Sequence, residues 1–137
     1  MKILMLTLDR LKYRVARASY SNDSSLIGKE YECKDCLLIM IHVEEFDKER
    51  RNRVLKKLLN NITWYSRKTG NNNIVLHSFA HLSEDKADPA FAMSIIREAE
   101  NKLKKKGLNI HTTPFGYFLE LEIKIKGGPI ARVFKSL

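Results

Sequence analysis

The spacing of apolar residues changes along the chain, and this change constrains the fold more than any other feature of the sequence. Between Phe46 and Thr69 apolar residues recur about every 3.6 positions, which predicts a helix with Gly70 as its C-cap. A second helix is predicted to begin at Pro89, with Asp88 as its N-cap, and to end before Gly107. The apolar segments outside these two helices have the patterns of strands, so an α/β fold is predicted.

The strand segments either alternate with a period of two or form unbroken apolar runs. We expect Lys2–Leu8 and Lys12–Ala16 to form a hairpin, and Ile130–Phe134 to pair back onto the strand before it. This order predicts a mixed β-sheet with two main helices in a single domain over residues 1–137. No G-x-G-x-x-G or P-loop motif follows any of these strands, so nucleotide binding of those types has no support. The remaining strand segments are Cys36–Val43, Ile74–His77, Leu108–Thr112 and Tyr117–Lys126.

The chain is strongly basic, with 25 Lys and Arg against 16 Asp and Glu and a formal net charge of +9. Such a balance favours a polyanionic partner, with nucleic acid first and a membrane surface second. A lysine-rich surface that stabilises a protein at high temperature is the alternative. No segment has the length of apolar sequence that a membrane-spanning helix needs, and the N-terminus lacks the features of a signal peptide. We therefore expect a cytoplasmic protein with no membrane partner.

Two polar clusters stand where predicted strands end, which is where ligands bind in open α/β sheets. They are His77–Ser83 and Thr112–Tyr117. The residues alone leave His81 open as a general base, a metal ligand, an orienting donor or a structural loop histidine. Phe115 and Tyr117 flank a glycine, which suits either stacking of an unpaired base or a turn closed by aromatic rings. No metal-binding spacing is present, and we expect no metal site.

Cysteine and the remaining histidines carry weaker signals. Cys33 and Cys36 form a C-x-x-C that enters a predicted strand, whereas a thioredoxin-like pair needs a helix N-terminus. We interpret them as two ordinary thiols in a reducing compartment and leave a disulfide between them open. His42 lies inside an apolar run, where a histidine satisfied in the core or at a pocket edge is more common than a ligand.

Several short motifs extend along nearly the whole chain. They are Met1-Lys2-Ile3-Leu4, Ile41-His42-Val43-Glu44, Phe79-Ala80-His81-Leu82-Ser83, Pro89, Ala92-Met93, Gly107, Asn109, Pro114-Phe115-Gly116-Tyr117, Lys126-Gly127 and Pro129. In this order the motifs resemble the N-terminal editing domain of archaeal threonyl-tRNA synthetases, a family whose members typically show FAHLSS, APFGYYKAFK and CKGHPLAE.

The resemblance implies a fold shared with D-aminoacyl-tRNA deacylases, usually as a homodimer, and a proofreading task on the 3′ end of the threonine tRNA. Such domains hydrolyse the ester of serine wrongly attached to that tRNA. A synthetic site that accepts threonine discriminates weakly against serine, because one missing methyl group changes binding by only about 1 to 3 kcal/mol. The family uses an activated water, helped by the terminal ribose hydroxyl, a pocket lysine and backbone donors, and requires no metal or other cofactor.

Carried over residue by residue, the resemblance implies a pocket with three parts. His81 is the candidate catalytic residue, and with Phe79 and Ala80 it would form one wall. Val43 and its neighbours would face the amino acid. The adenosine side would be formed by Pro114, Phe115, Gly116 and Tyr117.

This chain departs from the family pattern at several positions. Leu119 stands where the family has its lysine, and Arg132 stands where it has a glutamate. Gly128 replaces a histidine, and Thr7-Leu8 replaces His-Ser. Loss of the lysine removes the cation that would hold or polarise the attacking water.

Three functions therefore stay open. The first is an editing domain that hydrolyses mischarged seryl-tRNA, with a threonyl-tRNA synthetase catalytic body in the same chain or as a separate partner. The second is a domain of the same fold that binds tRNA or a partner domain without hydrolysis. The third is a D-aminoacyl-tRNA deacylase, although the motifs of that family are not visible here.

Overall fold

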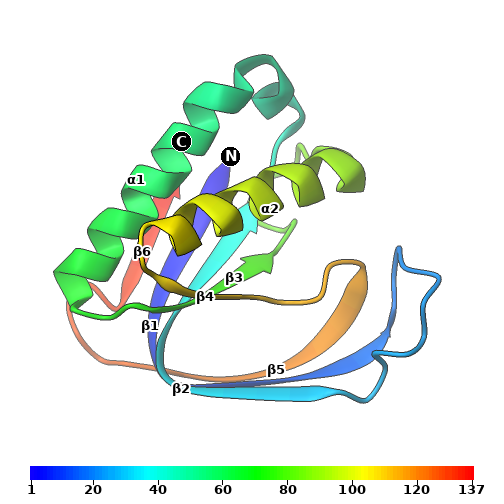
Figure 1. The fold of residues 1–137 in the computed structure, drawn as a ribbon, viewed down its shortest axis with the longest axis horizontal. Helices are drawn as coiled ribbons and strands as arrows, with labels where there is room; N and C mark the ends of the chain where they lie inside the picture. Colours follow the sequence, from blue (N-terminus) through cyan, green and yellow to red (C-terminus); the bar gives the residue numbers. More distant parts are fainter.

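A computed structural model describes residues 1–137 and shows a six-stranded mixed sheet with both helices on one face (Figure 1). The strand order is β4-β3-β2-β1-β5, and β6 lies beside the first part of β1. The pairs β2–β3 and β3–β4 are parallel, whereas β1 runs antiparallel to β2, β5 and β6. In chain order the elements are β1 (Lys2–Ala18), β2 (Glu30–His42), the 3₁₀ helix η1 (Glu45–Arg50), α1 (Arg51–Thr69), β3 (Asn73–Ser78), α2 (Pro89–Lys105), β4 (Asn109–Thr112), β5 (Tyr117–Ile125) and β6 (Arg132–Ser136).

The N-terminal hairpin predicted between Lys2–Leu8 and Lys12–Ala16 is wrong, because both segments belong to the single strand β1. The pairing of β1 with β5 shifts register between Leu8 and Arg10, as in a β-bulge at Asp9. On the sheet face opposite the helices, the extra residue moves the buried positions of β1 from even numbers, such as Leu8, to odd numbers, such as Leu11. The polar residues Asp9 and Arg10, which separate the two predicted strands, lie at this bulge.

A matching irregularity occurs in the neighbouring strand. β2 begins at Glu30, six residues before the predicted start at Cys36. Asp35 has a φ of 48°, a left-handed conformation that is rare for a residue other than glycine. It is held by Asn71, which donates to its carbonyl at 2.9 Å, and by Lys126, whose Nζ lies 2.5 Å from its carboxylate. The hairpin of β1 and β2 bends near these irregularities, and its outer half continues with β5 as a curved arm away from the helices (Figure 1).

The C-terminal strand also has a partner that differs from the predicted one. β6 pairs with Lys2–Leu6 of β1 and not with β5. β5 already pairs with β1 from Leu8 onward, so β6 occupies the part of the same edge that β5 leaves free. The last residue consequently returns to the first, with the Leu137 N–H donating to the Met1 carbonyl at 2.9 Å.

Both predicted helices are confirmed, together with their caps. Gly70 ends α1 with a φ of 67°, and the Asp88 side chain accepts the Phe91 N–H at the start of α2. The predicted start near Phe46 corresponds to η1, and the α-helix proper begins at Arg51. Neither helix is long and apolar enough to cross a membrane.

Apolar side chains are buried on both faces of the sheet. The larger cluster joins α1 and α2 to the inner positions of β1, β2 and β3, among them Ile3, Ile39 and Leu76. The smaller cluster lies on the opposite face and includes Leu38 and Val75. The predicted mixed α/β architecture with two main helices is therefore confirmed.

His77, near the end of β3, gives the fold a specific pH dependence. Its Nδ1 lies 2.9 Å from the Thr113 hydroxyl, and burial lowers the pKa of His77 to about 4, against about 6.5 in an unfolded chain. Between these values the unfolded chain binds a proton that the folded chain does not. The free energy of unfolding should therefore fall, by up to about 3 kcal/mol, as the pH falls through this window. Urea unfolding at a series of pH values measures the loss.

His77→Gln should remove this part of the pH dependence while keeping a polar partner for Thr113. His81→Gln, which changes an exposed histidine, is the matched control and should retain the wild-type slope. An unchanged slope between about pH 6.5 and 4 in His77→Gln would contradict the assignment.

Candidate functional site

The main candidate site is a pocket of about 420 Å³ at the carboxyl ends of the parallel strands β2 and β3. This is the edge of an open α/β sheet at which ligands bind. Its lining is mostly apolar, with charged side chains among the rest, a composition typical of small-molecule sites. The lining residues are Tyr20, Ile41, Val43, Glu45, Ser78, Ala80, Lys86, Ala87, Asp88, Pro89, Ala92 and Phe115.

One wall of the pocket is the loop between β3 and α2, and main-chain hydrogen bonds attach both ends of this loop to β2. The Phe79 N–H donates to the Ile41 carbonyl at 2.9 Å, and the Ala87 N–H donates to the Val43 carbonyl at 2.9 Å. These bonds continue the pairing of β3 with β2 beyond the strand ends. They hold Ala80 and Ala87 against the pocket.

His42 holds the middle of the same loop. It is fully buried, as its position in an apolar run suggested. Its Nδ1 accepts the Leu82 N–H at 3.0 Å, so the ring proton is on Nε2, which donates to the Asp85 carbonyl at 2.6 Å. A neutral imidazole satisfies both groups, whereas a doubly protonated ring has no acceptor for Leu82. His42 is therefore a positioning residue for the pocket wall.

An ionic cluster holds the outer side of this loop. Glu44 accepts the Ser83 hydroxyl at 2.9 Å and pairs with the buried α-ammonium group of Met1. That ammonium also lies 2.8 Å from Asp47, which is fully buried. Burial alone raises the pKa of Glu44, but the hydrogen bonds from the ammonium group and Ser83 outweigh it, and the pKa is lowered. Glu44 is thus ionised and holds Ser83 of the loop in place. The sequence motif that contains Glu44 did not predict this role.

The opposite wall depends on the carbonyl of Gly116. It accepts three successive N–H groups, from Ser19 at 2.7 Å, Tyr20 at 3.1 Å and Ser21 at 3.2 Å. Gly116 has a φ of 90°, and a Cβ atom there would lie 3.1 Å from the Ser21 nitrogen. Only glycine fits both conditions without strain. The result is that Tyr20, an exposed residue, stands at the pocket rim.

Tyr117 reinforces this wall from outside the pocket. Its hydroxyl accepts from the Ser21 side chain at 3.0 Å and donates to the Asp23 carbonyl at 2.6 Å. Both bonds tie the loop after β1 to the start of β5. Tyr117 is placed as a support for the loop that carries Tyr20.

The structure brings only some of the sequence-predicted residues to the pocket. Val43, Ala80 and Phe115 line it. His81 is exposed, and its ring meets Phe79 edge-on, with centroids 5.2 Å apart. Phe79 itself packs against the smaller core cluster. Neither these two residues nor Pro114, Gly116 and Tyr117 are among those that line the pocket.

The positions that depart from the family pattern also lie elsewhere. Leu119 is on β5, opposite Val15 of β1, and Arg132 begins β6, opposite Leu6. Lys86 is the one cationic side chain among the lining residues. Sequence reasoning missed Lys86 and Tyr20, although a lysine two residues before a helix N-cap is a signal that could have indicated a cation at that helix start.

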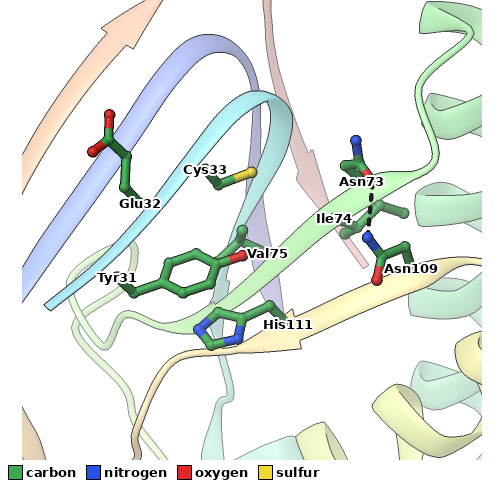
Figure 2. A pocket seen from close by; sticks show the side chains of 8 residues that line it. All are labelled: Tyr31, Glu32, Cys33, Asn73, Ile74, Val75, Asn109 and His111. Carbon is green, nitrogen blue, oxygen red and sulfur yellow. Dashed lines mark hydrogen bonds between the residues drawn. The ribbon is translucent and has the colours of Figure 1, made fainter.

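A second hollow, of about 200 Å³, lies between β2, β3 and β4 (Figure 2). The rings of Tyr31 and His111 stack with centroids 3.7 Å apart, and His111 Nε2 lies 2.8 Å from the Tyr13 hydroxyl. Asn109 donates to the Asn73 side chain at 2.9 Å. Burial raises the pKa of Tyr31 to about 12 and lowers that of His111, so both rings are neutral near pH 7. The polar groups here are largely paired with one another.

The two cysteines lie at and behind this second hollow. Cys33 lines it, Cys36 is buried in the smaller core cluster, and both are free thiols. Burial raises the pKa of Cys36, which keeps the thiol protonated. Nowhere do three or more His, Cys, Asp or Glu side chains converge in a way that could hold a metal ion.

The role given to His42 predicts a local effect on the pocket wall. His42→Leu fills a similar space but leaves the part-buried Leu82 N–H without an acceptor, which costs about 1 to 2 kcal/mol. The β3–α2 loop should open more often, and hydrogen exchange at Leu82 should accelerate by about tenfold or more. Met40→Leu, a nearby buried change without a loop hydrogen bond, is the control. Equal exchange at Leu82 in both variants would refute the role.

Comparisons with known proteins place this geometry in a family. Residues 1–137 match the model of the archaea-specific editing domain of threonyl-tRNA synthetase. The chain is 30% identical to threonine–tRNA ligase of Thermococcus onnurineus over 139 residues, and 28% identical to those of Pyrococcus furiosus and Methanobrevibacter smithii over 139 and 138 residues. Each match covers 100% of this chain and 22% or 23% of the relative. The chain therefore spans about a fifth of the length of these relatives.

A solved structure titled c-Myc DNA Unwinding Element Binding Protein has the same fold, with a TM-score of 0.72 over 100% of this chain and 99% of that one. At 11% identity this likeness concerns the fold alone. The family match extends over every residue of the sheet, the two helices and the pocket. The chain accordingly belongs to the archaea-specific editing domain family of threonyl-tRNA synthetase, with the D-aminoacyl-tRNA deacylase-like fold that its motifs implied.

Proposed function

We propose that the pocket at the ends of β2 and β3 hydrolyses the ester bond of threonine tRNA wrongly charged with serine. The observation that carries this proposal is a 420 Å³ pocket with an apolar floor and one cation, at the ligand-binding edge of a chain from an editing-domain family. A second site is needed because the synthetic site gains only about 1 to 3 kcal/mol from the methyl group that serine lacks.

Each end of the substrate has chemically suitable partners in the pocket. Phe115 and Tyr20 present aromatic rings at the rim, which suit the terminal adenine of the tRNA because bases stack on such rings. We assign the adenosine side to Phe115, supported by its neighbours Pro114, Gly116 and Tyr117. Val43 faces the amino acid, with Ala80 beside it. Phe79 and His81 flank Ala80 in the chain and contact each other edge-on. A catalytic role for His81 stays part of the proposal.

The proposed reaction adds one water molecule to the ester. The water oxygen attacks the carbonyl carbon, the bond from that carbon to the ribose oxygen breaks, and the ribose oxygen takes up the proton that the water loses. Free serine and uncharged tRNA are the products. Lys86 is positioned to stabilise the negative charge on the carbonyl oxygen in the transition state, in place of the lysine that Leu119 replaces.

The first experiment compares release of the amino acid from seryl-tRNA and threonyl-tRNA of the threonine acceptor, and from a D-aminoacyl-tRNA. We expect rapid release from the seryl ester and slow release from the other two. Lys86→Met should lower the seryl rate about tenfold, less than the 10² to 10³ that a buried donor contributes, because water screens an exposed charge. Lys34→Met, which removes an exposed lysine outside the pocket, is the control and should keep the wild-type rate.

Each other outcome has a definite meaning. Binding of seryl-tRNA without turnover would favour the domain that only binds tRNA or a partner. Release of the D-ester alone would favour a D-aminoacyl-tRNA deacylase. Equal rates for Lys86→Met and wild type would remove Lys86 from the mechanism without affecting the pocket.

The proposal extends to the setting of the domain. The relatives are threonine–tRNA ligases four to five times longer than this chain, so a catalytic body of that kind, in the same chain or as a partner, would supply the mischarged tRNA. We propose the cytoplasm, where tRNA is charged, as the place of this activity.

A homodimer is the last part of the proposal. β5 ends the sheet with an unpaired edge, and it carries the exposed side chains Phe118 and Leu121. Exposed strand edges with apolar side chains favour pairing with another chain. Sedimentation equilibrium should give twice the 15.9 kDa of one chain for wild type, and Leu121→Glu should shift the mass toward one chain. Phe46→Glu, at an exposed apolar residue of η1, should leave the dimer intact, and a dimer in Leu121→Glu would exclude this edge.

A further inference from the structure

The outer face of α1 carries a positive charge that no acidic residue of the helix offsets. Six of its 19 residues are basic and none is acidic, which is a large share of the net charge of +9 of the chain. Buried positions such as Val54 and Leu58 alternate with these residues, so the basic side chains lie toward solvent. The basic residues are Arg51, Arg53, Lys56, Lys57, Arg67 and Lys68.

This charge is largely unpaired. Within α1 only Arg51 has a carboxylate partner, Glu98 of α2, at 2.6 Å. On the sheet and on α2, several basic residues do have acidic partners. Such pairs include Arg10–Glu32, Lys12–Glu30, Arg14–Glu120, Lys102–Glu98, Lys104–Glu100 and Lys126–Asp35.

The pattern is unfavourable for the helix itself. The first turn of α1 contains Arg51 and Arg53 and no acidic residue, although the helix dipole favours negative charge there. Arg53 and Lys57 are four positions apart, and like charges at that spacing cost about 0.2 to 0.5 kcal/mol. Arg67 and Lys68 lie in the last turn, where the helix dipole favours positive charge. Helix stability does not explain the basic residues of the first two turns, whereas binding to a polyanion explains both groups.

Trp64 lies in the same line of side chains. Helical spacing places Arg53, Lys57, Trp64 and Lys68 in one stripe. Trp64 is 42% exposed, and Lys135 of β6 lies over its ring, with Nζ 5.8 Å from the centroid. An exposed indole among unpaired cations can pack on a ribose or base while its neighbours contact phosphates.

We infer that the outer face of α1, with Trp64 near its centre, binds the sugar-phosphate backbone of a double-helical RNA stem. At about 1.5 Å per residue, α1 is about 28 Å long, enough to contact several successive phosphates. Its first turn follows directly on η1, whose first residue, Glu45, lines the pocket. An RNA with its 3′ end in the pocket can thus lay its stem along α1. The inference rests on the proposed function only for the identity of this RNA as a tRNA.

The single tryptophan of the chain makes the contact directly measurable, because Trp64 is the only source of indole fluorescence. Titration with uncharged threonine tRNA, and with a short RNA duplex, should change the Trp64 emission. A membrane surface is the competing polyanion. Vesicles of anionic phospholipid should leave the emission unchanged, and a larger response to vesicles than to RNA would overturn the inference.

Charge-matched variants test the location of the contact. In one variant Lys56, Lys57, Arg67 and Lys68 are changed to Gln. In the control Lys29, Lys34, Lys105 and Lys106, which are exposed and form no ion pair, are changed to Gln, so that both lose four charges. The α1 variant should bind RNA at least about tenfold more weakly. The slope of log K against the logarithm of the salt concentration should become shallower by about 3 to 4, one unit for each lost phosphate contact. Equal losses in both variants would overturn the inference.

A minimal substrate separates this inference from the proposed function. The α1 variant should hydrolyse the seryl ester of adenosine at the wild-type rate, since that ester has no stem. If the wild-type protein hydrolyses this ester but the α1 variant binds tRNA as tightly as wild type, the inference about α1 is wrong and the proposed function stands. If the wild-type protein binds RNA through α1 but releases no serine, the proposed function is wrong and the inference about α1 stands. Circular dichroism confirms that both variants are folded.

Discussion

β1 is hydrogen-bonded to β2, β5 and β6, and this sharing of one 17-residue strand is the constraint on which the rest of the structure depends. Its first part joins β6 and the sheet that the helices cover, while its second part joins β5 in the curved arm. The bulge at Asp9 and the left-handed Asp35 lie side by side in the hairpin of β1 and β2. Each changes which side chains of its strand face inward. These irregularities keep Leu8 and Leu11 in one core cluster on either side of the bend.

The pocket lies at the end of the straight half of the sheet, and its walls are loops attached by backbone groups. His42 is neutral and holds two main-chain groups, while Glu44 is ionised and holds Ser83 together with the α-ammonium group. Both lie at the end of β2, directly beneath the loop that they position. This arrangement preorganises the pocket, so the ester of the proposed substrate would meet dipoles that are already ordered. Most of the basic residues of α1 have no carboxylate partner, whereas Arg10 and Lys12 of β1 are paired with glutamates of β2.

Local signals in the sequence were sufficient for the helices. Asp88, Pro89 and Gly70 act through hydrogen bonds and φ angles within a few residues, so their meaning does not depend on distant contacts. The strands were predicted less well, because one irregular residue changes which face a strand buries. Asp9 interrupts an alternation in the same way as a turn residue, and only pairing with β5 shows that the strand continues. The partner of β6 depends on which part of β1 is free, which no local pattern contains.

For the pocket, motif resemblance identified Val43, Ala80 and Phe115 without any coordinates. It also selected Gly116 and Tyr117, whose groups hold a neighbouring loop and do not line the pocket. Tyr20 and Lys86 come from loops that only chain folding brings to the rim. Composition, capping and motif order are properties of short segments, and the amino-acid sequence determines them directly. The bend of the sheet and the pocket rim arise from contacts between distant segments, and the tertiary structure alone decides them.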